Sequence, residues 1–155
     1  MSELDGPYLF DVGVIALAHT DAPVRDAALE YVQAGILGEI DVVVPNPAVI
    51  GAHNVLTTYY GRSNAEASRL LQNFLDAKRI HWHDEITHTV VRNAFSQASD
   101  ANVGGWDGYY AGVAIEEGVN TVLTIDDDFE RFDAFETEVI LSSDQFRELN
   151  QYLSR

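Results

Sequence analysis

The chain has 155 residues, and its 25 acidic side chains against nine basic ones give a formal net charge of −16 at pH 7. A hydrophobic content of 46% favours a packed core over disorder, and the absence of cysteine excludes disulfides, iron–sulfur clusters and cysteine-based zinc sites. No apolar run approaches the roughly 20 residues that cross a bilayer, and the acidic amino terminus is unlike a secretory signal, so we expect one cytoplasmic domain over residues 1–155 without membrane contact.

Short apolar runs alternate with stretches of helical spacing along the chain. The apolar runs predict five strands, at residues 8–11, 41–45, 79–83, 121–125 and 138–141. The stretches between them predict helices after Asp11, from Pro23 to about residue 38, from Pro47 to about Tyr60, from Ser63 onward, over 87–98, over 106–117, and after Ser142 or Ser143. Ser63 and Glu66 have the spacing of a capping box, which marks the start of the fourth helix.

Strands separated by helices pair in parallel, and right-handed crossovers place the helices on both faces of the sheet. The sequence therefore predicts an α/β fold, a three-layer α/β/α sandwich with a central, mostly parallel five-stranded sheet. Ligands of such sheets bind beyond the carboxyl ends of the strands. Two predicted strands end in acids at that edge, Asp11 and Asp126.

Two further aspartates stand where they can join this pair. Asp128 follows Asp126 by two residues, and Asp107 begins a predicted helix after a glycine-rich loop. Taken singly, Asp107 is explained as a helix cap and residues 126–128 as an acidic turn. Brought together, their charges repel, and a divalent cation relieves that repulsion. Mg²⁺ or Mn²⁺ prefers such oxygen ligands and can activate water against a phosphodiester.

Three segments resemble the PIN domain in their order and spacing over almost the whole chain. They are residues 8–11 (YLFD), 106–111 (WDGYYA) and 123–129 (LTIDDDF). The resemblance implies a PIN-like domain with Mg²⁺- or Mn²⁺-dependent ribonuclease activity, often the VapC-like toxin of a toxin–antitoxin pair. In that family, acids at the places of Asp11, Asp107 and Asp126 hold the metal, and a further catalytic acid matches Asp128. The resemblance also implies RNA as substrate, a cognate antitoxin and a homodimer.

The sequence departs from the family pattern on the helix after the second strand. The family places a glutamate there, whereas this chain has Gly51 and no acid from residue 45 to 62. Asn54 shares the helical face of Gly51, and His53 is the alternative if the register slips, so these two are the candidates to replace the acid. Residues 12–13 also lack the hydroxyl or amide side chain that often follows the first aspartate.

Two side chains are candidates for contact with RNA. Trp106 flanks Asp107 and can stack on a base, although core packing is the alternative at this spacing. Arg62 belongs to a group of five basic residues between positions 62 and 92, which form either a basic face or an ordinary solvated helix surface.

Two other functions compete with the nuclease interpretation. Residues 10–14 are similar to the nucleophile strand of haloacid-dehalogenase-type phosphatases, but that chemistry needs a second aspartate where Gly13 stands. A PIN-type domain that binds RNA or a protein partner without cutting is the stronger alternative, because the helix glutamate is missing.

The excess of acid also bears on the source of the protein. With Lys78 as the single lysine, the composition resembles that of proteins from halophilic archaea, whose carboxylates keep the surface hydrated. An ordinary acidic bacterial protein is the alternative. On the halophilic interpretation, self-repulsion destabilises the fold at low ionic strength, and about 1 M salt suppresses it because the Debye length falls to about 3 Å.

Overall fold

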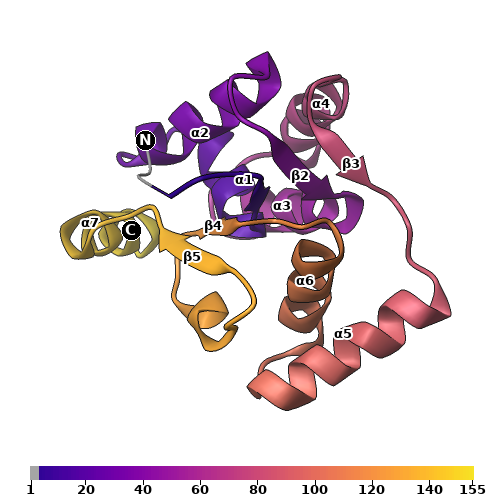
Figure 1. The fold of residues 1–155 in the computed structure, drawn as a ribbon. Helices are drawn as coiled ribbons and strands as arrows, with labels where there is room; N and C mark the ends of the chain where they lie inside the picture. The colour runs from indigo at the N-terminus through magenta and orange to yellow at the C-terminus, as the bar shows by residue number, and fades with distance from the viewer. Residues whose placement is uncertain (1–3) are drawn as a thin grey trace.

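A computed structural model describes residues 4–155, so the first three residues of the acidic amino terminus lie outside the described part (Figure 1). The elements in chain order are β1 (Tyr8–Phe10), α1 (Val12–Ala18), α2 (Arg25–Leu37), β2 (Val42–Pro45), α3 (Asn46–Thr58), α4 (Asn64–Leu75), β3 (His81–His83), α5 (His88–Ala101), α6 (Gly105–Glu116), β4 (Thr121–Thr124), the 3₁₀ turn η1 (Asp128–Arg131), β5 (Glu136–Val139) and α7 (Ser143–Leu153).

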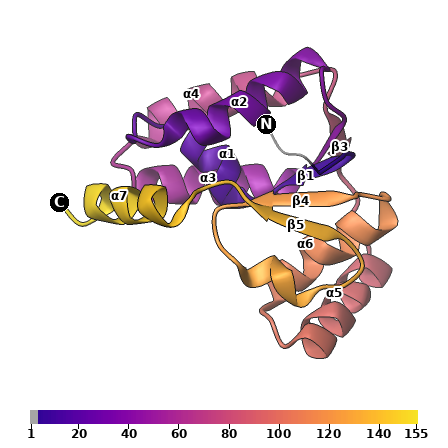
Figure 2. The same ribbon diagram turned by 60° about the vertical axis from the view of Figure 1, so that its left-hand side comes forward.

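The strands form one sheet in the order β3-β2-β1-β4-β5, and every neighbouring pair is parallel. Figure 2 shows α1, α2, α3 and α4 on one side of this sheet and α5 and α6 on the other. The predicted three-layer α/β/α architecture is therefore confirmed, and its five-stranded sheet is wholly parallel.

The three inner strands are buried along their whole length, with Leu9, Phe10, Val44 and Leu123 fully inaccessible. Continuous apolar strands of this kind are typical of parallel sheets that helices cover on both faces. The outer strands β3 and β5 are only partly buried. The apolar runs of the sequence thus mark the centre of the sheet more sharply than its edges.

Two local predictions need correction. Strand β5 covers residues 136–139 rather than 138–141, because its pairing with β4 sets Glu136 opposite Thr121 and ends with Val139 opposite Thr124. The capping box predicted at Ser63 is only half formed, since Ser63 accepts from the Glu66 backbone while the Glu66 carboxylate pairs with Arg62. A complete capping box is instead found at the start of α7.

Helix α5 packs on the outside of α6 rather than on the sheet (Figure 1). The two helices meet most closely at Gly108, where a Cβ would lie 2.9 Å from both the Cβ and the amide nitrogen of Ala98 and would also collide with the Ala94 carbonyl oxygen. Gly108 is therefore required by this close approach, and it follows directly after Asp107.

We predict that Gly108→Ala destabilises the fold, because the added methyl group overpacks the contact between α5 and α6. Overpacking of this kind costs roughly 1–3 kcal/mol, which for a chain of this size lowers the melting temperature by roughly 3–10 °C. Gly104→Ala is the matched control, since nothing lies within 4 Å of its added Cβ. Equal melting temperatures for the two variants would contradict the predicted clash.

Candidate functional site

Three aspartates lie at the carboxyl edge of the sheet. Asp11 follows β1 directly, Asp126 is the second residue after β4, and Asp107 lies in the first turn of α6. Strands β1 and β4 are parallel neighbours, so their carboxyl ends meet at the same edge. All three aspartates line one open hollow of about 860 Å³, which lies between α1, α3, α6 and α7.

Asp11 is the most buried of the acids, with 8% of its surface exposed. Its Oδ1 accepts a hydrogen bond from the Val12 backbone N–H at 2.7 Å, and its Oδ2 accepts one from the Thr124 hydroxyl at 3.0 Å. Burial, together with the charges of Asp126 and Asp107, raises the pKa of Asp11 to about 7, against the two hydrogen bonds that lower it. The carboxylate is thus held in place at a site that disfavours its charge.

Asp107 and Asp126 are half-buried and belong to the same electrostatic cluster. Burial raises the pKa of both carboxyl groups, and the nearby charge of Asp128 raises them further. Asp128 itself is exposed and is absent from the lining of the hollow, but its backbone N–H donates to Asp126 Oδ1 at 3.0 Å. The charges of Asp126 and Asp107 therefore act against that of Asp11, and the charge of Asp128 acts against those of Asp107 and Asp126.

Thr124 is a residue of this site to which the sequence analysis gave no role. Its hydroxyl donates to Asp11 Oδ2 and accepts from the Asp126 backbone N–H at 3.2 Å, so it links the two strand ends. It is fully buried as the last residue of β4. The signal was present in the sequence as a threonine two residues before Asp126, at the end of a buried strand.

The two candidates for the missing acid point in different directions. Asn54 lines the hollow from α3, and its Oδ1 lies 3.5 Å from the Thr58 hydroxyl. His53 is absent from that lining and forms a hydrogen bond with the Ser68 hydroxyl of α4 at 3.0 Å. Of the two, only Asn54 is placed to contribute an oxygen ligand beside the aspartates.

The two candidates for RNA contact also differ. Trp106 lines the hollow beside Asp107. Arg62 does not line it; its guanidinium lies 3.5 Å from an Asp21 carboxylate oxygen and 3.4 Å from one of Glu66, and it donates to the His19 carbonyl. Arg62 thus joins the segment after α1 to the start of α4.

The residues that depart from the family pattern are packed against one another. A Cβ at Gly51 would lie 3.1 Å from Cγ2 of Val12, and one at Gly13 would lie 2.7 Å from Cγ1 of Ile125. The Val12 side chain therefore occupies the space next to Gly51 where a longer side chain would begin. Gly51 and Val12 thus form an apolar contact between α1 and α3, and Val12 would crowd a Cβ at position 51.

Whether a divalent cation fits this site depends on the donor atoms that line it. Among residues 4–155, no group of three or more His, Cys, Asp or Glu side chains is placed to hold a metal ion as it stands. The carboxylates nevertheless disfavour one another's charge, and Mg²⁺ is commonly bound through one or two carboxylates with several of its waters retained. The chemistry of Asp11, Asp107 and Asp126 fits such a hydrated ion rather than a fully protein-coordinated one.

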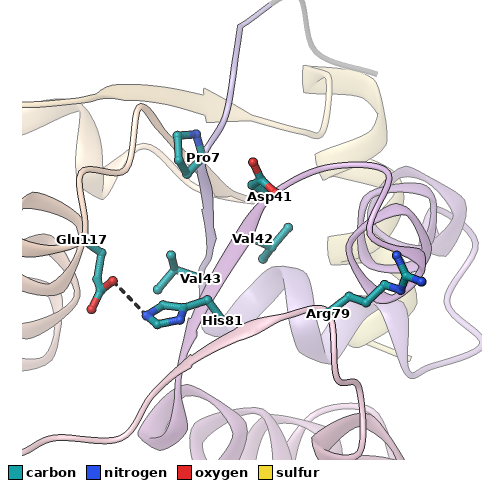
Figure 3. A pocket seen from close by; sticks show the side chains of 7 residues that line it. All are labelled: Pro7, Asp41, Val42, Val43, Arg79, His81 and Glu117. Carbon is teal, nitrogen blue, oxygen red and sulfur yellow. Dashed lines mark ion pairs between the residues drawn. The ribbon is translucent and has the colours of Figure 1, made fainter.

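A second hollow, of about 300 Å³, lies at the opposite, amino edge of the sheet (Figure 3). It is lined by Pro7, Asp41, Val42, Val43, Arg79, His81 and Glu117. His81 Nε2 lies 2.9 Å from Glu117 Oε2, and His83 Nε2 lies 3.6 Å from Glu116 Oε2. These two pairs fasten the edge strand β3 to the end of α6, and the hollow shares no residue with the aspartate site.

No family model matches the chain, and no curated protein matches its sequence. Solved structures with the same architecture do match. The chain is similar to VapBC2 from Rickettsia felis bound to a DNA fragment from their promoter, with 15% identity over 84% of this chain and 96% of that one and a TM-score of 0.62. It is also similar to PAE2754 from Pyrobaculum aerophilum, with 19% identity over 95% of this chain and 94% of that one and a TM-score of 0.58. A further similarity is to FitAcB from Neisseria gonorrhoeae, with 21% identity over 84% of this chain and 95% of that one and a TM-score of 0.56.

The chain has a PIN-like fold. In this PIN-like fold the segments that carry the sequence resemblance, residues 8–11, 106–111 and 123–129, all reach the carboxyl edge of the sheet. Within residues 4–155 no helix is both long and apolar enough to span a bilayer.

The raised pKa of Asp11 predicts a stability that falls with pH in metal-free protein. The folded chain keeps the Asp11 proton up to about pH 7, whereas the unfolded chain loses it near the ordinary value of 3.8. The free energy of unfolding therefore decreases as pH rises from about 4 to 7. Asp11→Asn removes this titration, so the variant should exceed the wild type by about 1–4 kcal/mol at pH 8 and by less at pH 5.

Urea unfolding in EDTA at the two pH values measures this difference. Asp76→Asn, at an exposed position after α4, is the control, and its free energy of unfolding should equal that of the wild type at both pH values. A difference between Asp11→Asn and the wild type that is the same at pH 5 and pH 8 would show that the Asp11 pKa is not raised.

The bridging role of Thr124 predicts a further rise of the Asp11 pKa in Thr124→Val. The variant keeps the shape of the side chain but removes the hydroxyl that stabilises the ionised carboxylate. A ¹³C NMR titration of the carboxyl group measures the change. Thr121→Val is the control, because the equally buried Thr121 hydroxyl donates to the Asp5 carbonyl. An unchanged or lower Asp11 pKa in Thr124→Val would rule out the bridge.

Proposed function

We propose that this chain is a Mg²⁺- or Mn²⁺-dependent ribonuclease that hydrolyses phosphodiester bonds at the aspartate site. The observation that carries the proposal is the mutual repulsion of Asp11, Asp107 and Asp126 on the wall of one hollow. Acids gathered in this way destabilise the fold unless a cation or proton offsets their charge. A substrate-binding hollow beside a divalent cation is the simplest use of such an arrangement.

Each acid has its own part in this function. Asp11, Asp107 and Asp126 would hold the cation, which supplies activation of a water molecule and stabilisation of charge on the phosphate. Thr124 fixes the rotation of the Asp11 carboxylate, and the Asp128 backbone fixes that of Asp126. Asp128 is exposed beside them, and its carboxylate would add negative charge next to the cation.

The biological setting that we propose is a toxin–antitoxin pair. Its support is the VapC-like sequence resemblance together with the structural similarity to VapBC2 and FitAcB. A cognate antitoxin protein and a second copy of this chain would then be the partners, and the chain would act in the cytoplasm. A short neighbouring gene for a DNA-binding antitoxin is the genomic observation that would support this setting.

The alternative function is binding of RNA or a protein partner without cleavage. It is favoured by the contact between Gly51 and Val12, which leaves α3 without an acid on this wall. With one carboxylate fewer than the family pattern, the site has less negative charge to attract a divalent cation. Whether the purified protein cleaves RNA distinguishes the two functions.

We predict that Asp107→Asn abolishes cleavage of structured RNA in the presence of Mn²⁺, because it removes one of the charges that hold the cation while keeping the side-chain shape. The assay is run at high KCl, since the acidic composition predicts that salt stabilises the fold. Asp76→Asn is the control and should cut like the wild type. Cleavage by Asp107→Asn at the wild-type rate would contradict the proposed site, and a wild type that never cuts would favour the binding function.

We also predict that Asn54→Asp strengthens the response to Mn²⁺, because it adds a carboxylate to the wall that lacks one. The expected result is a lower Mn²⁺ concentration for half-maximal cleavage. Asn73→Asp, which adds the same charge at an exposed position of α4, should leave that concentration unchanged. Equal decreases of the half-maximal Mn²⁺ concentration in Asn54→Asp and Asn73→Asp would contradict the prediction, because they would show that the added net charge and not its position sets the response.

A further inference from the structure

Trp106 is the most exposed large aromatic side chain on the rim of the aspartate site. It immediately precedes Asp107 in the first turn of α6, and 63% of its surface is accessible. Both Trp106 and Asp107 line the same hollow. An indole that does not pack into the core exposes a broad apolar surface beside a group of charged carboxylates, so core packing does not explain its position.

The indole is held in a fixed orientation by two buried tyrosines. The Trp106 ring is stacked on Tyr110, with ring centroids 6.1 Å apart and an angle of 23° between the planes. It also meets Tyr109 edge to face, at 5.9 Å and 83°. Both tyrosines are only 5% exposed. The aromatic stack thus has a rigid inner layer, and its outer layer is Trp106.

The charges around the hollow limit what can bind there. Its described lining contains three aspartates and neither lysine nor arginine. The guanidinium of Arg62 is paired with acids elsewhere. A nucleic acid therefore cannot be held here by a basic groove, and beyond a metal-bridged phosphate its affinity has to come from contacts that do not depend on charge. Stacking on an aromatic ring is such a contact, because every base has an apolar face.

We propose that Trp106 is the platform on which one unpaired nucleobase of a single-stranded RNA stacks, extending the Tyr110–Trp106 stack by one layer. This rests on the proposed function for the identity of the polymer. A base seated on Trp106 places its adjoining phosphate next to Asp107, since the two side chains line the same hollow. A paired base cannot present its face in this way, so the platform selects single strands over duplexes.

The direct test uses Trp106 as its own reporter. Trp82→Phe removes the other tryptophan, which lies on β3 with its ring against Phe74, and leaves Trp106 as the sole tryptophan. The probes are a short single-stranded oligoribonucleotide, the same sequence in a duplex, and an abasic ribose–phosphate oligomer. EDTA prevents metal-dependent cleavage, and 1 M KCl shortens the Debye length to about 3 Å so that charge repulsion does not hide stacking.

The expected result is saturable quenching of Trp106 fluorescence by the single strand, without quenching by the duplex or the abasic oligomer. In binding assays monitored through a labelled single strand, Trp106→Ala should weaken affinity roughly 5- to 150-fold, while Trp106→Phe retains most of it. Leu37→Ala is the control, because Leu37 is 62% exposed and lines neither of the hollows that Trp106 lines. It should bind like the wild type.

Equal quenching by the abasic oligomer or the duplex, or no quenching by any oligonucleotide, would overturn the platform. A basic amphipathic peptide serves as a fourth probe. Quenching by this peptide and by none of the oligonucleotides would also overturn the platform and would assign the surface to a protein segment. The outcome is separable from the ribonuclease proposal. Cleavage that depends on Asp107 without any effect at Trp106 leaves the ribonuclease standing, whereas quenching by single strands without cleavage of any RNA leaves only the platform.

Discussion

Strands β1 and β4 lie side by side at the centre of the sheet, and an aspartate follows each of them at the same edge. Their parallel register sets Phe10 beside Leu123, so the next residues, Asp11 and Thr124, stand close enough for a buried hydrogen bond. That bond holds a carboxylate where burial and the charge of Asp126 both act against it. The apolar burial of the inner strands supplies the stability that tolerates this arrangement.

The wall formed by α3 distinguishes this site from the pattern of the family that the sequence resembles. Val12 fills the space beside Gly51, so the first turn of α1 and the middle of α3 approach each other through apolar atoms. The result is a hollow that is acidic where β1 and β4 end and α6 begins, and largely apolar elsewhere, with Ile50, Tyr59 and Phe146 on its sides. With the proposed cation bound, such a surface would accept both the phosphate and the base of a nucleotide.

The sequence predicted the layers of the fold and the convergence of the aspartates because both follow from periodicity. Inner strands are apolar throughout, and parallel strands necessarily bring their carboxyl ends to one edge. The features that it missed depend on three-dimensional contacts. The exact span of β5 is set by its pairing with β4, and the stacking of α5 on α6 depends on the absence of a side chain at Gly108.

Helical phase explains why the side chains on α3 could not be assigned from the sequence. His53 and Asn54 are adjacent and therefore point about 100° apart, so a shift of one residue exchanges their roles. The structure turns Asn54 toward the aspartates and His53 toward Ser68. The contacts of Arg62 could not be assigned from the sequence either, because its partners Asp21 and Glu66 belong to two segments that only the fold brings together.

The central claim is that Asp11, Asp107 and Asp126 share one divalent cation. Carbon-detected NMR of side-chain carboxyl groups, during a titration with substoichiometric Mn²⁺, shows directly which acids the ion approaches. The account predicts that these three resonances broaden first and together, before those of acids elsewhere, such as Glu85 after β3. If the resonances of Asp11, Asp107 and Asp126 stay sharp while those of acids elsewhere on the surface broaden, the claim is contradicted.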